Sequence, residues 1–189
     1  MKIYIKAAIT NIFDEPLEDR QDIALDPNTS VDTLIKLSED KDPTVRLCLI
    51  VNPNTPKDIV DKLLSNGEWT FLEQVALCLS VEPDVLARLA KHSHPAVRGK
   101  VAFNIYTPSA VLEDLASDEN ESVRWNVAGN KNTPVDILIE MAKDDSSYIR
   151  SGVANNPSTP TSIVKMLAKD SVEVVSRLAK QNLGNRRNR

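Results

Sequence analysis

The sequence predicts an all-α solenoid of short two-helix repeats, and three periodic patterns predict it. Arginine recurs every 26 residues over most of the chain, an asparagine column runs in step with it, and apolar residues repeat at helical spacing around both. A fixed period of this length is typical of stacked repeat architectures. The two columns are Arg20, Arg46, Arg98, Arg124 and Arg150, and Asn52, Asn104, Asn130, Asn156 and Asn182.

The first helix of each predicted repeat carries the arginine. An apolar residue precedes the arginine, and two more follow four and five positions after that residue, as in Val123, Val127 and Ala128. This spacing places three apolar side chains on one face of a short helix. The same pattern predicts a first helix around Val45, Val97 and Ile149.

A turn ending in Thr-Pro follows the asparagine and predicts the start of a second helix, as at Thr133-Pro134. The threonine hydroxyl is expected to accept a hydrogen bond from an unpaired N–H of that helix, and the proline is expected at its first position. Ile137, Leu138 and Met141 then form the apolar stripe of this helix.

Each predicted helix has only about two to three turns, and isolated helices of that length are unstable in water. The repeats must therefore gain stability by stacking. We predict an N-terminal cap, helix or short strand, at residues 1–18, a solenoid of about six repeats plus a partial one at 19–182, and a basic, disordered tail at 183–189.

The third repeat departs from the pattern. Leu72 stands in the arginine column, Cys78 stands in the asparagine column, and Glu82-Pro83 comes one position later than Thr-Pro elsewhere. We interpret this as a local insertion that is compensated downstream, with Trp69 filling the irregular loop. Drift in a tolerant array and a bend specific to a ligand are alternative explanations.

The motif Val-Arg-x-x-Val-Ala-x-Asn-x-x-Thr-Pro, followed by Leu-x-x-Leu-Ala, resembles the leucine-rich repeat variant family over roughly residues 20–182. The match is close at Val123, Arg124, Val127, Ala128, Asn130, Thr133, Pro134, Leu138, Met141 and Ala142. The resemblance implies a right-handed superhelix of alternating α and 3₁₀ helices, related to HEAT and armadillo arrays. One type of family member carries an iron–sulfur module. Such a cluster needs about four cysteines, and only Cys48 and Cys78 are present, so no cofactor is expected.

Composition favours a soluble single domain. Of the 189 residues, 41% are hydrophobic and 26% charged, and no apolar run approaches the roughly 18 residues of a membrane span. Lys6 interrupts the amino-terminal apolar stretch, which argues against a signal peptide. Cys48 and Cys78 occupy different repeat columns, so no disulfide framework is expected, and the predicted compartment is the cytoplasm.

The arginine and asparagine columns have a structural and a functional interpretation. Aspartate recurs six positions before the arginines, as at Asp40, Asp118 and Asp144. Guanidinium groups could pair with these aspartates across the turns between repeats, or they could line a groove for phosphate or carboxylate. The structural interpretation is favoured, with the asparagines bonding backbone groups at the turns. The predicted structural ladder is Arg46, Arg98, Arg124, Arg150, Asn52, Asn104, Asn130 and Asn156.

No motif predicts catalysis or metal binding. His92 and His94 are the only two histidines, and they are too few for a ligand set. The sequence holds no Ser-His-Asp order and no Gly-rich phosphate loop. We therefore predict no enzyme, no catalytic residue and no metal site.

Function is expected in the two variable columns that follow the arginines, as one continuous strip. Trp125 is the predicted anchor for a partner protein or peptide, flanked by Glu73, Gln74, Lys100 and Asn126. Alternatively, Trp125 only completes packing against the neighbouring repeat. The predicted function is a non-enzymatic protein-interaction scaffold. A nucleic-acid-binding array related to repair is the second hypothesis, based on analogy with HEAT-like DNA glycosylases and on the basic tail.

Overall fold

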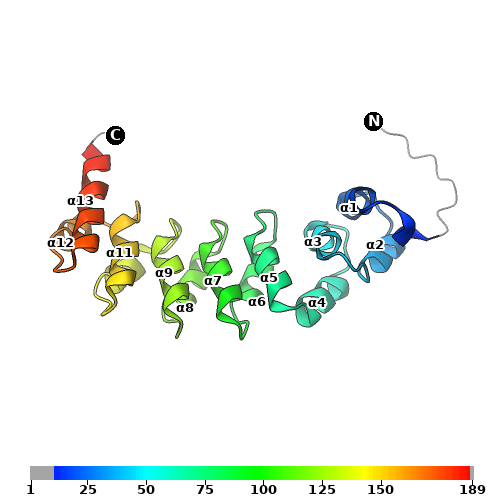
Figure 1. The fold of residues 1–189 in the computed structure, drawn as a ribbon, viewed down its shortest axis with the longest axis horizontal. Helices are drawn as coiled ribbons and strands as arrows, with labels where there is room; N and C mark the ends of the chain where they lie inside the picture. Colours follow the sequence, from blue (N-terminus) through cyan, green and yellow to red (C-terminus); the bar gives the residue numbers. More distant parts are fainter. Residues whose placement is uncertain (1–10, 188–189) are drawn as a thin grey trace. The chain divides into compact units, whose positions relative to one another are not determined.

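The computed structural model describes residues 11–187, which contain thirteen α-helices, one short 3₁₀ helix and no β-strand (Figure 1). Residues 1–10 of the predicted cap lie outside this range; the rest of the cap forms the 3₁₀ helix η1 (Ile12–Asp14) and enters α1. The first helices of the repeats are α1 (Leu17–Leu25), α3 (Pro43–Val51), α5 (Trp69–Leu77), α7 (Pro95–Phe103), α9 (Glu121–Gly129), α11 (Ser147–Asn155) and α13 (Glu173–Arg187). The second helices are α2 (Val31–Leu37), α4 (Lys57–Asn66), α6 (Pro83–Leu89), α8 (Ser109–Leu115), α10 (Val135–Met141) and α12 (Thr161–Leu167).

Each of the two series of helices begins at intervals of 26 residues, which confirms the predicted all-α repeat. Both helices of a repeat are α-helical. Within the described residues, η1 is the one separate 3₁₀ helix, and i to i−3 bonds otherwise occur in turns and at helix ends, including those of the second helices. There the N–H of Lys143 donates to the Glu140 carbonyl at 2.9 Å, an i to i−3 bond that tightens the helix end.

The third repeat contains no insertion, which corrects the sequence interpretation. α6 begins at Pro83, 26 residues after α4 begins at Lys57. The irregularity is instead the length of α4, which has 10 residues where α2 has 7. Trp69 does not fill the irregular loop, since it begins α5 and is 44% exposed.

The chain forms two compact units, Met1–Val75 and Ala76–Arg189. In each, the predicted apolar columns form the core. Leu34, Leu37, Val45 and Leu49 are fully buried in the first unit. In the second unit, the fully buried side chains include Leu86, Val97, Leu112, Val123, Leu138 and Ile149.

Each asparagine of the ladder ties its repeat to the preceding one. The Asn130 amide nitrogen donates to the carbonyls of Ala102 at 2.8 Å and Asn104 at 2.9 Å, and its side-chain oxygen accepts from the N–H of Asn132 at 2.9 Å. Asn52, Asn104, Asn156 and Asn182 make the same pair of donations to their preceding repeats. In the second unit, the carbonyl of one ladder asparagine accepts from the next, so the bonds continue from repeat to repeat.

The threonine of the Thr-Pro turn acts on the helix before it, not on the helix after it as predicted. The Thr133 hydroxyl donates to the Val127 carbonyl at 2.5 Å, and Thr107 and Thr159 do likewise in their repeats. Pro134 itself is the N-cap of α10, without a side-chain cap, and its carbonyl accepts from Leu138. The turn therefore satisfies the end of one helix while proline starts the next.

The predicted disordered tail differs from the structure, because α13 continues to Arg187. Arg186 donates to the Asn182 side-chain oxygen at 2.6 Å and to the Thr159 carbonyl at 2.7 Å. No Thr-Pro turn follows Asn182, and Arg186 occupies the oxygen that elsewhere accepts from the turn. The helix can therefore run on.

We expect Asn130→Ala to lower the free energy of unfolding by about 3 kcal/mol, because it leaves buried carbonyls without donors. Urea denaturation followed by circular dichroism measures this change. Asn155→Ala is the matched control: Asn155 is exposed on α11, so its effect should stay within about 0.5 kcal/mol. Equal effects of the two substitutions would contradict a stabilising role for the ladder.

Candidate functional site

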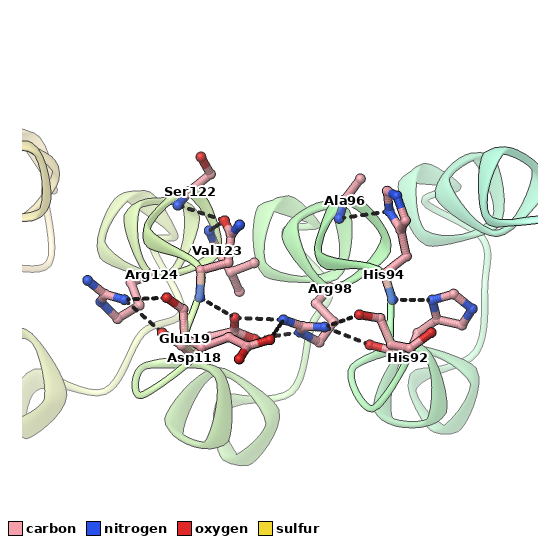
Figure 2. A network of polar contacts seen from close by, with 11 residues as sticks. His92, His94, Ala96, Arg98, Asp118, Glu119, Ser122, Val123 and Arg124 are labelled. Carbon is pink, nitrogen blue, oxygen red and sulfur yellow. Dashed lines mark hydrogen bonds and ion pairs between the residues drawn. The ribbon is translucent and has the colours of Figure 1, made fainter.

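The arginine column pairs with aspartates of the following repeat. Arg98 donates to Asp118 through Nε at 2.6 Å and Nη2 at 2.9 Å, and its Nη1 donates to the carbonyls of His92 and Ser93, both at 2.8 Å (Figure 2). Arg150 with Asp170 has the same arrangement. Arg20 also pairs with Asp40, but its Nη1 donates to one carbonyl, that of Glu15, and the Nε of Arg124 lies 3.6 Å from Asp144. One guanidinium group thus joins two repeats and a loop.

Burial and pairing act together on these aspartates. The pKa of Asp170 is lowered mainly by the hydrogen bond from Arg150, against the opposing effect of burial. For Asp118, burial is the largest single effect and raises the pKa, but the hydrogen bonds from Arg98 and the Asn120 N–H, together with the charges of Arg98 and Arg124, outweigh it and the pKa falls. Both carboxylates therefore stay ionised near neutral pH and remain paired with the guanidinium groups of their arginines.

We expect Arg150→Gln to reduce the acid sensitivity of folding. The pKa of Asp170 is lowered in the folded state from its ordinary 3.8, so its contribution to stability is present above that pH and is lost as the pH falls through the folded pKa. Removing Arg150 removes this contribution. Urea unfolding at a series of pH values from neutral to strongly acidic measures the slope. Lys165→Gln, at an exposed position of α12, should leave the slope unchanged; an unchanged slope in Arg150→Gln would refute the assignment.

Trp125 is half-buried and packs against the next repeat. Its ring stacks on Tyr148 with centroids 5.0 Å apart and planes 10° apart. A Cβ atom added to Gly152 would lie 3.4 Å from the Trp125 ring, so the glycine makes room for the indole. This geometry favours the alternative interpretation of Trp125, in which the ring packs against the neighbouring repeat. Part of the ring remains exposed.

The two columns after the arginines do not form one continuous exposed strip. Gly99, Ser151 and Gly152 are buried beneath their neighbours. Of the predicted contact residues, Glu73 and Gln74 belong to the first unit, while Lys100, Trp125 and Asn126 belong to the second. Gln74 is exposed and the other four are half-buried.

A glycine pair tests this packing. Gly152→Ala should destabilise the chain by about 1–3 kcal/mol, because its Cβ would lie 2.9 Å from that of Ala128. Gly129→Ala meets nothing within 4 Å and should be stabilising by about 0.5 kcal/mol. Thermal and urea denaturation of the two variants measure the difference, and a tolerated alanine at 152 would show that the contact with Trp125 is loose.

An apolar surface that the sequence analysis missed lies at the last residues of α5 and α7 and on the turns that follow them. It consists of five side chains that are between 40% and 61% exposed: Leu77, Leu79, Phe103, Ile105 and Tyr106. We call this surface the turn patch. The amide of Asn104 donates to the carbonyls of Ala76 and Cys78 at 2.8 and 3.1 Å, so the two turns lie side by side in the second unit.

The signal for the turn patch was present in the sequence, in columns that were assigned to turns. The positions equivalent to Phe103, Ile105 and Tyr106 carry small or polar residues in the next two repeats, namely Gly129, Lys131 and Asn132, and Asn155, Pro157 and Ser158. A comparison of turn columns between repeats would have shown this change from polar to apolar.

Residues 11–187 give little support for a metal site, a disulfide or a membrane span. No group of three or more histidine, cysteine, aspartate or glutamate residues is placed there to hold a metal ion. The rings of His92 and His94 accept hydrogen bonds from the N–H groups of His94 and Ala96, which ends the loop and caps α7 (Figure 2). Cys48 and Cys78 form no disulfide. None of the described helices has the length and apolar character to cross a membrane.

The structure defines a helical repeat protein. It is similar to a solved structure described as a leucine-rich repeat variant with a novel repetitive protein structural motif, with 19% identity and a TM-score of 0.61 over 89% of this chain and 67% of the other. At this identity the likeness shows the fold. An engineered protein aligns over 90% of this chain and 88% of its own at 17% identity, with a TM-score of 0.37 that supports no conclusion. No protein-family model and no curated protein matches the chain.

Proposed function

We propose that this chain is a non-enzymatic scaffold of the cytoplasm that binds a partner protein or peptide through the turn patch. The observation that carries the proposal is the clustering of five large, exposed apolar side chains on two adjacent turns. Contiguous exposed apolar surface is unusual on proteins that act alone and marks interaction sites. Phe103 and Tyr106 are of the aromatic type that is enriched at interfaces.

The backbone beneath the turn patch is already ordered, which favours binding. The N–H of Tyr106 donates to the Asn104 side chain at 2.8 Å, and the Ile105 carbonyl accepts from the Asn132 amide at 2.5 Å. A partner that binds there does not have to order these turns, so less of the contact energy is lost to conformational entropy.

The five residues predicted from the sequence are proposed as secondary contacts. Gln74 is exposed and so the most accessible of them, whereas Trp125 shares its ring surface with Tyr148. The nucleic-acid hypothesis has less support. Arg186 of the basic carboxyl-terminal segment donates to the Pro157 and Thr159 carbonyls, and the net charge of the chain is −4. Phosphate binding depends on lysine and arginine that are available to the backbone of the nucleic acid.

Photo-cross-linking in the native host tests the proposal. A photoreactive phenylalanine analogue at Ile105 should give a discrete adduct with a protein. The same analogue at Lys131, the equivalent position of the next repeat, should not. The double substitution Phe103→Ser with Tyr106→Ser should reduce the adduct by about tenfold or more, since aromatic anchors contribute most of the affinity at interfaces.

The matched control is Asn155→Ser, in the column of Phe103 but outside the turn patch, which should leave the adduct unchanged. Both variants alter exposed positions, so their melting temperatures should stay close to that of the parent. A protein adduct that survives the double substitution, or an adduct with nucleic acid alone, would reject the turn patch as the binding surface.

A further inference from the structure

Arg46 differs from the other arginines of its column in having no carboxylate partner. Its Nη1 donates to the carbonyls of Asp40 at 2.5 Å and Lys41 at 3.2 Å, as in the other repeats. In Arg98 the Nε and Nη2 edge is closed by an aspartate 20 residues downstream. The position equivalent to that aspartate is Asn66, and within residues 11–187 no carboxylate lies within ion-pair distance of Arg46.

The length of α4 explains why the edge of Arg46 is open. Asp118 and Asp170 stand in turns, where a carboxylate oxygen also accepts from an N–H two residues on, at 2.8 and 2.9 Å. Asn66 is instead the last residue of α4. The junction between the second and third repeats therefore lacks both the acidic side chain and the turn that presents it.

Arg46 lines a groove of about 560 Å³ within the first unit, between α3, α4 and the start of α5. The Arg46 guanidinium carbon lies 5.4 Å from the centre of the Phe71 ring, a cation–π contact that holds the planar group in place. Gln74, Thr70 and Asn66 supply neutral polar groups in the same groove.

We propose that this groove binds the side-chain carboxylate of an aspartate from a partner polypeptide, in the position that Asp118 and Asp170 take beside their own arginines. Two charge-assisted hydrogen bonds to Nε and Nη2 would form the contact. The site deepens the proposed function, since it names a second contact for a polypeptide partner. The two sites share no residue, since the groove is lined by residues of the first unit and the turn patch belongs to the second, so substitutions can test them separately.

The charges of the groove favour a single carboxylate over a phosphate group. Lys62 is paired with Glu39, Asp40 is paired with Arg20 from outside the groove, and Glu68 also lines the groove. Arg46 is therefore the one cation left without a carboxylate partner among the described lining residues. A ligand with one negative charge balances it, whereas the second charge of a phosphate would face Glu39 and Glu68.

NMR of the full-length ¹⁵N-labelled chain tests the proposal, with the arginine Nε–Hε signals as the readout. The probes are a blocked peptide, acetyl-Ser-Gly-Asp-Gly-Ser-amide, its Asp→Asn analogue, the Asn analogue with a free carboxyl terminus, and an analogue with phosphoserine in place of Asp. The Asp peptide should shift the Arg46 signal saturably, and the Asn peptide should bind about tenfold more weakly. Arg98, already closed by Asp118, should not respond.

Three variants complete the test. Arg46→Lys keeps the charge but loses the planar pair of donors, so it should abolish saturable binding; its melting temperature and the unchanged Arg98 signal show that it is folded. The double substitution Phe103→Ser with Tyr106→Ser should bind the Asp peptide as the parent does, so a failure of the turn patch is distinguishable from a failure here. Glu68→Gln should bind at least as well as the parent.

The proposal is overturned if the Asp and Asn peptides shift Arg46 equally or not at all. It is also overturned if only the free carboxyl terminus binds, or if the phosphoserine peptide binds more tightly than the Asp peptide. Binding by Glu68→Gln but not by the parent would show that Glu68 already closes the guanidinium edge, and would likewise reject the site.

Discussion

The need to give hydrogen-bond donors to carbonyl groups at helix ends governs this structure. A helix leaves its last four carbonyls without partners, and that loss is large for second helices of 7 residues and first helices of 9. The asparagine, arginine and threonine columns each supply donors to such groups. Asn130 serves the preceding repeat, Arg98 serves its own loop, and Thr133 serves the helix before it. Because two of these columns also reach a neighbouring repeat, the same bonds that complete the helices hold the stack together.

This dependence explains why the fold could be predicted from the sequence. A donor that serves the same carbonyl in every repeat must recur with the period of the backbone, so counting columns was enough to find the helices and their 26-residue spacing. The direction of the bonds was less accessible. In the sequence, Thr133 lies between the end of one predicted helix and the start of the next, so its hydroxyl could bond to either. Only the folded turn shows that it donates to the preceding helix, at the Val127 carbonyl. The extension of α13 to Arg187 likewise depends on a side chain, Arg186, that reaches carbonyls of the preceding repeat.

The candidate surface was harder to predict because exposure depends on neighbours from other repeats. The residues in the two columns after the arginines vary, which suggested that their side chains are not packed. Gly152, however, lies against the Trp125 ring, so a small residue is needed there. Variation there reflects complementary pairs of large and small residues. The turn patch shows the converse: Tyr106 stands in a column that carries asparagine or serine in the other complete repeats, and it is 56% exposed.

The third repeat shows how a scaffold of this kind can acquire binding surfaces. Replacement of a residue that bonds two repeats removes that hydrogen bond and leaves the donors or acceptors of its former partner without a bond. The chemical consequence depends on which group is left. Asn66 in place of aspartate leaves the Nε and Nη2 of Arg46 without a carboxylate, and Arg46 lines the groove that we propose as a binding site. Leu72 and Cys78, in the arginine and asparagine columns, bring no side-chain donor of comparable reach, and the chain divides into its two compact units between Val75 and Ala76. Leu77 and Leu79 of the turn patch belong to this repeat, while Phe103, Ile105 and Tyr106 belong to the next one, so the proposed surface depends on the bonds that Asn104 makes between the two.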